Sequence, residues 1–151
     1  MRYTATRAAL VVCTLCITLL LVPAVLLLRI IKPLYRIRYG YFIVDRIGHF
    51  AFDVGHYLSG SEASPNQRGR DIFFFEGTVA NKYFSELCRR KILVTPIARY
   101  LYRTNGLVPY GSDQQLLPAR IKTASRDHDG LLGITGSAFS FTESEEAQGK
   151  K

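Results

Sequence analysis

The chain has 151 residues, of which 48% are hydrophobic and 21% are charged, so its composition excludes a disordered or collagen-like protein. Lys and Arg number 20 against 12 Asp and Glu, which gives a net charge of +8 at pH 7. The three cysteines are too few for a disulfide scaffold.

Residues 8–31 form the first distinct element, a long apolar run without a charge from Ala8 to Leu28. About 20 apolar residues span a bilayer as a helix, and Pro23 within the run is tolerated in such helices. We therefore predict an uncleaved transmembrane anchor over 8–31. The alternative is a cleaved signal peptide, which has a shorter apolar core and a cleavage site with small residues.

Basic residues flank the anchor unevenly. Arg2 and Arg7 precede it, whereas five Lys and Arg residues follow it from Arg29 to Arg46. Flanking Lys and Arg favour the cytoplasmic side, so the asymmetry predicts a cytoplasmic domain after a single-pass anchor. Three tyrosines in the same stretch are typical of a collar at the lipid headgroups. We therefore expect the lipid bilayer as a partner, and no nucleic acid.

Strand and helix patterns alternate after the anchor. Residues 37–44 are rich in aromatic and β-branched side chains and predict a strand. Residues 49–58 place apolar side chains on one helical stripe, and a polar loop over 59–70 follows. The apolar run 71–76 predicts a parallel neighbour of the first strand, in a sheet covered on both faces. This order predicts an α/β fold, a Rossmann-like partial parallel sheet in a domain over 35–151, preceded by the transmembrane helix.

Two further helices are predicted from their capping residues. Asn81 is suited to the N-cap of a helix that follows the second strand. Thr95 and Pro96 are typical of the start of another helix, with Thr95 as the cap and Pro96 in the first turn. Asn105 and Gly106 form a C-terminal glycine signal, which predicts that this helix ends there.

A capping box lies close to the end of the chain. Thr142 and Glu145 have the spacing of this motif, which predicts a helix just before the sequence stops at Lys151. At a natural C-terminus, a short helix with little apolar face would not need a capping box. We therefore expect an incomplete domain, and the alternative is a frayed polar tail.

The loop between the first strand and the first helix contains the candidate site residues Arg46, Gly48 and His49. In open α/β sheets, ligands bind outside the carboxyl ends of the strands. The free amides and the dipole of a helix start attract anions. Gly48 allows close approach to the backbone, Arg46 suits a phosphate or carboxylate, and His49 in the first turn suits a general base.

Asp53 and His56 follow His49 at i+4 and i+7, a spacing that predicts one helix face opposite the apolar stripe. Asp53 would then hold the His49 imidazole in one tautomer, as an orienting carboxylate does for a general base. Two other interpretations stay open. One is a metal site, although zinc motifs usually have tighter pairs and a further anchor, and the other is a solvated polar face.

A cluster of basic residues on the later helices is a second candidate feature. It consists of Arg89, Arg90, Lys91, Arg99 and Arg103. The cluster is interpreted as a surface that rests on acidic lipid, as a site for an anionic donor or acceptor, or as a solvated face.

Four segments carry a resemblance to known proteins: R-I-G-H-F at 46–50, D-I-F-F-F at 71–75, N-K-Y-F at 81–84 and P-I-A-R-Y-L-Y at 96–102. Together they resemble a family of bacterial glycosyltransferases whose members start with an R-I-G-H loop and whose layout is similar to that of GT-B enzymes. The resemblance runs from about residue 35 to the end, where R-D-H-D-G-L-L at 126–132 looks like the lead-in to a next α/β unit.

The resemblance implies sugar transfer from a nucleotide-sugar donor, which is a co-substrate and not a cofactor, to a cell-envelope or glycan acceptor. In GT-B enzymes the N-terminal domain usually holds the acceptor, so the chain would be an anchor plus part of the acceptor domain. We expect His49 and Asp53 to be catalytic, and Arg46, Gly48 and Asn81 to bind substrate, with no metal ion. The alternative is a small membrane-tethered binding or scaffolding module without catalysis.

Overall fold

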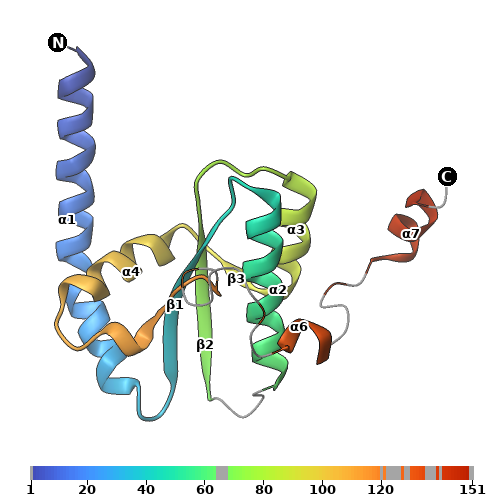
Figure 1. Cartoon of the computed structure of the whole chain (residues 1–151). Helices are drawn as coiled ribbons and strands as arrows, with labels where there is room; N and C mark the ends of the chain where they lie inside the picture. The colour runs from blue at the N-terminus through green and yellow to red at the C-terminus, as the bar shows by residue number, and fades with distance from the viewer. Residues whose placement is uncertain are drawn as a thin grey trace.

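The computed structural model describes residues 2–63, 68–119, 121, 127, 130–134, 139 and 141–149. In chain order (Figure 1), its elements are α1 (Arg2–Ile31), β1 (Arg36–Ile43), α2 (Ile47–Ala63), β2 (Gly69–Glu76), α3 (Lys82–Lys91), β3 (Leu93–Val94), α4 (Ile97–Leu107), the 3₁₀ turn η1 (Ser112–Gln114), β4 (Gln115–Leu116), α6 (Leu131–Ile134) and α7 (Glu143–Gly149). Residues 64–67 of the predicted loop and part of the tail segment 126–132 lie outside the described residues.

Four strands of the described chain form one parallel sheet in the order β3-β2-β1-β4. β1 and β2 pair over their whole length, from Arg36 opposite Gly69 to Ile43 opposite Glu76. The α2 helix connects these two strands, so the predicted strand–helix–strand unit and the α/β fold class are confirmed. The sequence did not predict β3 and β4, because strands of two residues are too short to show a hydrophobic pattern.

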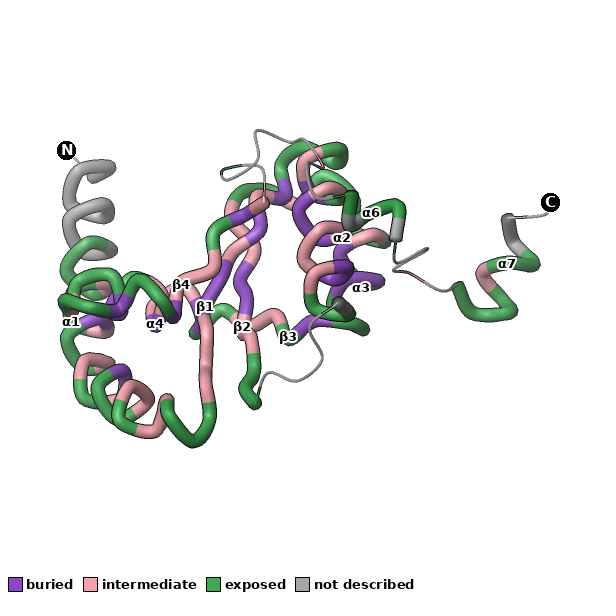
Figure 2. Tube along the Cα trace, turned by 60° about the horizontal axis from the view of Figure 1, so that its bottom comes forward, coloured by how far each residue is buried: buried purple, intermediate pink, exposed green. Residues whose placement is uncertain are grey.

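Helices cover both faces of the sheet, with α2 and α3 on one side and α4 and α1 on the other (Figures 1 and 2). Phe42 of β1 and Val44, which follows the strand, belong to the core cluster that α2 and α3 complete. Tyr39 of β1 belongs instead to the cluster with Val25 of α1 and Leu101 of α4. Even and odd positions of β1 thus face opposite layers, as the two-residue period of a strand requires.

Gly40 lies in β1, which pairs with β2 on one side and β4 on the other. A Cβ atom at this position would lie 2.7 Å from Cε1 of Phe73 and 2.9 Å from Cβ of Leu116. The Phe73 ring occupies this space and stacks on Phe42 with a centroid distance of 4.7 Å. Glycine at this position therefore lets an aromatic ring of β2 pack close to the backbone of β1.

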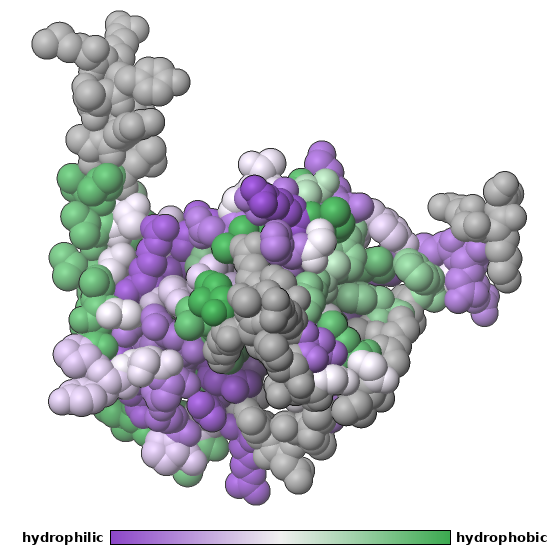
Figure 3. Space-filling model, in the orientation of Figure 1, coloured by the Kyte–Doolittle hydropathy of each residue, from purple (hydrophilic) through white to green (hydrophobic). Residues whose placement is uncertain are grey.

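The α1 helix is seated on the domain over its C-terminal half. Its segment Val11–Ile31 has a mean hydropathy of 2.9 and is long and apolar enough to cross a membrane. Thr104 Oγ1 of α4 donates to the Thr18 carbonyl at 3.2 Å, and Val25 is fully buried between α1 and the sheet. The preceding part of α1 projects beyond the domain, and its described side chains form a hydrophobic column (Figures 1 and 3).

Arg29 joins the end of α1 to the end of α4. Its guanidinium donates to Asn105 Oδ1 at 2.9 and 3.1 Å and to the carbonyls of Asn105, Val108 and Pro109. Carbonyls at a helix C-terminus lack partners within the helix and carry partial negative charge, so a cation is favourable there. The predicted end of α4 at Asn105 and Gly106 is displaced by one residue, because Asn105 is buried against Arg29 and the helix ends at Leu107 with Val108 as its C-cap.

Two capping predictions are confirmed. Asn81 Oδ1 accepts a hydrogen bond from the Phe84 amide at 2.9 Å and caps α3. The Thr142 amide donates to the Glu145 carboxylate at 2.7 Å, and the Glu145 amide donates back to Thr142 Oγ1 at 3.4 Å. Both bonds of a capping box are thus present at the start of α7.

Two boundary predictions are wrong. Thr95 does not cap α4, because the helix starts after Pro96 and has no hydrogen bond from a capping side chain. The predicted loop 59–70 is too long at both ends, since α2 continues to Ala63 and β2 begins at Gly69. Ser59 is buried, so packing against the domain extends the helix through residues whose own helix propensity is low.

Candidate functional site

The loops after β1 and β2 lie side by side at the carboxyl ends of the strands. The Val44 amide donates to the Glu76 carbonyl at 3.0 Å, and the Ala80 amide donates to the Val44 carbonyl at 2.8 Å. Gly77 adopts a φ of +92°, a conformation that glycine adopts readily, at the turn out of β2. These bonds bring the two loops together, and they hold the candidate residues Arg46 and Asn81 at one edge of the sheet.

We call this region the carboxyl edge and define it by Arg46, Gly48, His49 and Asn81. Arg46, Gly48 and Asn81 are exposed, and His49 is half-buried. The Phe50 amide donates to the Arg46 carbonyl at 3.0 Å as α2 begins, and the first amides of a helix have no partner within it. Apart from its chain neighbours and the backbone of its own helix, no heavy atom lies within 4 Å of a Cβ built at Gly48. The space beside Gly48 at the start of α2 is therefore open to a ligand.

Asp53 does not join this edge. It is fully buried, on the same side of α2 as Phe50 and Val54, whereas the sequence placed it opposite the apolar stripe. Residues three apart share a helix face, so Asp53 at i+3 from Phe50 turns toward the domain. His49, by contrast, is half-buried in the first turn of α2, so the structure places the two side chains in different surroundings.

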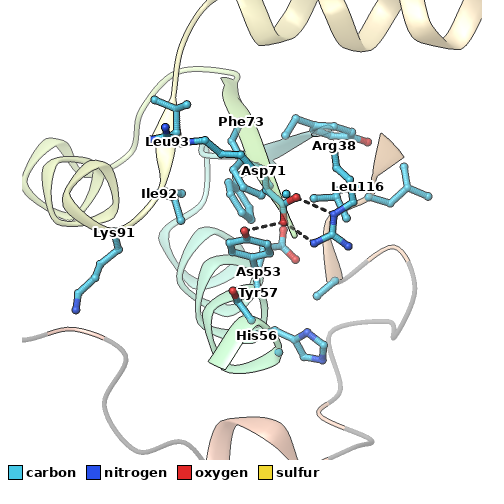
Figure 4. A pocket seen from close by; sticks show the side chains of 18 of the residues that line it. Arg38, Asp53, His56, Tyr57, Asp71, Phe73, Lys91, Ile92, Leu93 and Leu116 are labelled. Carbon is cyan, nitrogen blue, oxygen red and sulfur yellow. Dashed lines mark hydrogen bonds and ion pairs between the residues drawn. The ribbon is translucent and has the colours of Figure 1, made fainter. Parts of the chain in front are cut away.

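A cavity of about 510 Å³ lies at the other end of the sheet, against the amino ends of β1 and β2 (Figure 4). The C-terminal turns of α2 and α3 and the segment after β4 complete its wall. We call it the basic cavity because its charged lining residues include more cations than carboxylates: Arg36, Arg38, Arg68, Arg70 and Lys91, against Asp53 and Asp71.

Arg38, Tyr57 and Asp71 form a hydrogen-bonded cluster in the wall of the basic cavity. Arg38 binds the Asp71 carboxylate through both Nε and Nη2, at 2.7 and 2.6 Å, and the Tyr57 hydroxyl donates to the same carboxylate at 2.8 Å (Figure 4). The hydrogen bond to Asp71 raises the pKa of Arg38, and burial together with the Asp71 charge raises the pKa of Tyr57. Arg38 therefore stays charged and Tyr57 stays protonated, so both act as donors.

The basic cluster predicted on the later helices is divided in the structure. Arg90 pairs with Glu145 at 2.9 Å, and Arg99 donates to the Phe75 carbonyl at 3.0 Å. Lys91 lines the basic cavity, and Arg103 is exposed on α4. The cluster therefore is not one binding surface, and only Lys91 of these residues contributes to the cavity wall.

Sequence reasoning missed the cluster of Arg38, Tyr57 and Asp71, although a signal for it was present. Arg38 and Asp71 each lie near the start of a predicted strand, and the two strands were expected to be parallel neighbours. Parallel pairing places such residues at the same edge of the sheet, and the structure pairs Arg38 directly with Asp71. The exact register needed to bring the opposite charges together comes only from the structure.

Comparison of the chain with protein-family models, with curated proteins and with solved structures gave no match. Among the described residues, no group of three or more His, Cys, Asp and Glu side chains is arranged to hold a metal ion. The carboxyl edge and the basic cavity are the features of the described residues whose chemistry bears on function.

Proposed function

We propose that the chain is the membrane-anchored, acceptor-side part of a glycosyltransferase that moves a sugar from a nucleotide-sugar donor to a cell-envelope or glycan acceptor. One observation supports the proposal: Arg46, Gly48, His49 and Asn81 share an open edge at the carboxyl ends of two parallel strands. Open α/β sheets bind ligands at this edge. The R-I-G-H segment of the resemblance contributes three of the four residues.

The residues of the carboxyl edge suit the charges of this reaction. His49 accepts the proton of the acceptor hydroxyl, the hydroxyl oxygen bonds to the anomeric carbon, and the bond from that carbon to the nucleotide diphosphate breaks. The negative charge that develops on the departing diphosphate is stabilised by Arg46 and by the first amides of α2. Asp53 is buried away from His49, so the proposal assigns it no part in orienting the base.

The direction of α1 supports an acceptor at the membrane surface. In Figure 1 the projecting part of α1 extends past the carboxyl ends of β1 and β2, on the side where α2 begins. Insertion of this apolar part into a bilayer turns the carboxyl edge toward the lipid. We therefore propose that the acceptor is linked to a membrane lipid, and that the domain lies on the cytoplasmic side, which the excess of basic residues after the anchor favours.

The test measures sugar incorporation into membrane lipids by membranes that contain the full protein, with a panel of nucleotide sugars. His49→Ala should lower turnover by roughly 10²–10⁴-fold, the range for loss of a general base. Arg103→Gln is the matched control, because Arg103 is exposed on α4 and lies outside both candidate regions. Unchanged turnover in the His49→Ala variant, or no donor consumption at all, would overturn the proposal and favour the non-catalytic binding module.

A further inference from the structure

The basic cavity has a surplus of positive charge that its own carboxylates do not neutralise. Asp71 is fully engaged, because it accepts two bonds from Arg38 and one from Tyr57. Arg70 and Lys91 make no hydrogen bond or ion pair within the described part of the chain, and both are exposed where they line the cavity. Like charges gathered around one hollow repel each other, and an anion bound there relieves that repulsion.

A buried guanidinium nitrogen in the cavity wall indicates where an anion would bind. Nε of Arg36 is buried and has no hydrogen-bond partner among the described residues, and a guanidinium nitrogen is always a donor. A buried polar atom without a partner costs free energy that a ligand acceptor recovers. Arg36 is held in place, since its Nη2 donates to the Asp113 carbonyl at 2.9 Å. The cavity therefore combines a guanidinium held by a hydrogen bond with two exposed cations at its rim.

We infer that the basic cavity is a second binding site, which takes a small molecule carrying a phosphate or diphosphate group. Its volume of about 510 Å³ lies within the range of ~300–1,000 Å³ that is typical of small-molecule sites. Arg36 binds the phosphate from inside the cavity, and Arg70 and Lys91 bind it from the rim. The Arg38–Asp71 pair stabilises the cavity wall. This site is at the opposite end of the strands from the carboxyl edge, so it does not depend on the glycosyltransferase proposal.

The experiment titrates the full chain in neutral detergent micelles with inorganic pyrophosphate at low ionic strength, with binding followed by calorimetry. Short-chain phosphatidic acid is titrated separately, because a phosphate group can come from a free metabolite or from a lipid. The variants are Arg70→Gln and Lys91→Gln, which break no bond that the described structure contains. Arg103→Gln is the control for the loss of one surface charge outside the cavity lining.

Saturable binding that weakens roughly tenfold or more in Arg70→Gln and in Lys91→Gln, but not in Arg103→Gln, supports the inference. If only phosphatidic acid behaves in this way, the inference holds and the phosphate belongs to a lipid. Equal weakening in all three variants, or no saturable binding of either probe, overturns it. Loss of sugar transfer in His49→Ala has no bearing on this result, so failure of either proposal is distinguishable from failure of the other.

Discussion

Substitution of Gly40 by alanine should destabilise the domain, because the added methyl group has no room. Its Cβ would lie 2.7 and 2.9 Å from two atoms of the Phe73 ring and 2.9 Å from the Cβ of Leu116. Ordinary contacts of a Cβ atom begin at about 3.4 Å. Either the Phe73 ring or the β4 strand must therefore move to admit the methyl group.

Neither neighbour of Gly40 is free to move. The Phe73 ring packs against Phe42 with a centroid distance of 4.7 Å and against Tyr57 at 4.6 Å. Leu116 belongs to β4, which pairs with β1 at Gly40 itself. Overpacking of a core costs about 1–3 kcal/mol. For a chain of this size, that corresponds to a fall in Tm of roughly 3–10 °C.

The assay is thermal unfolding of the full chain in detergent, followed by circular dichroism. Gly48→Ala is the matched control, because a Cβ at that position meets no atom within 4 Å outside its own helix. Gly48 lies in the first turn of α2, so alanine there should leave Tm unchanged or raise it slightly. A Gly40→Ala variant that melts within 1 °C of the parent, or an equal loss in Gly48→Ala, would refute the packing argument.

Asp71→Asn should lower the free energy of unfolding by about 2–3 kcal/mol, measured in urea, because Arg38 and Tyr57 lose a charged acceptor; a stability equal to that of the parent would contradict this. Arg29→Met should cost about 3 kcal/mol and increase cleavage after α4 in limited proteolysis, since several carbonyls lose their donor; an unchanged digestion pattern would show that the contact is not needed. Burial raises the pKa of the Cys88 thiol to about 12. The stability that the buried neutral thiol contributes is therefore complete below the unfolded pKa of about 8.5, and it is lost as the pH rises toward 12. Cys88→Val should therefore flatten the fall in Tm between about pH 9 and 11, and a fall as steep as in the parent would count against this origin.

The sequence by itself determined the elements that carry their own local signal. An apolar run over 8–31 predicts a long helix whatever surrounds it, and aromatic and β-branched residues over 37–44 predict a strand. The cap at Asn81 and the capping box at Thr142 were also predictable, because the side chain bonds to a backbone amide three residues away. The parallel order of the two long strands followed from the helix between them.

Tertiary contacts decided the features that join distant parts of the chain. The end of α4 depends on Arg29, more than 70 residues earlier, so the helix runs one residue past the local glycine signal at Gly106. Asp53 is polar, yet its place on α2 beside Phe50 turns it into the interior, away from His49. The basic cavity exists only because β1 and β2 pair in one register beside the ends of α2 and α3. The hydrophobic pattern of a sequence predicts which faces of its helices and strands are apolar. The partner of each polar group, by contrast, is determined by packing across the whole fold.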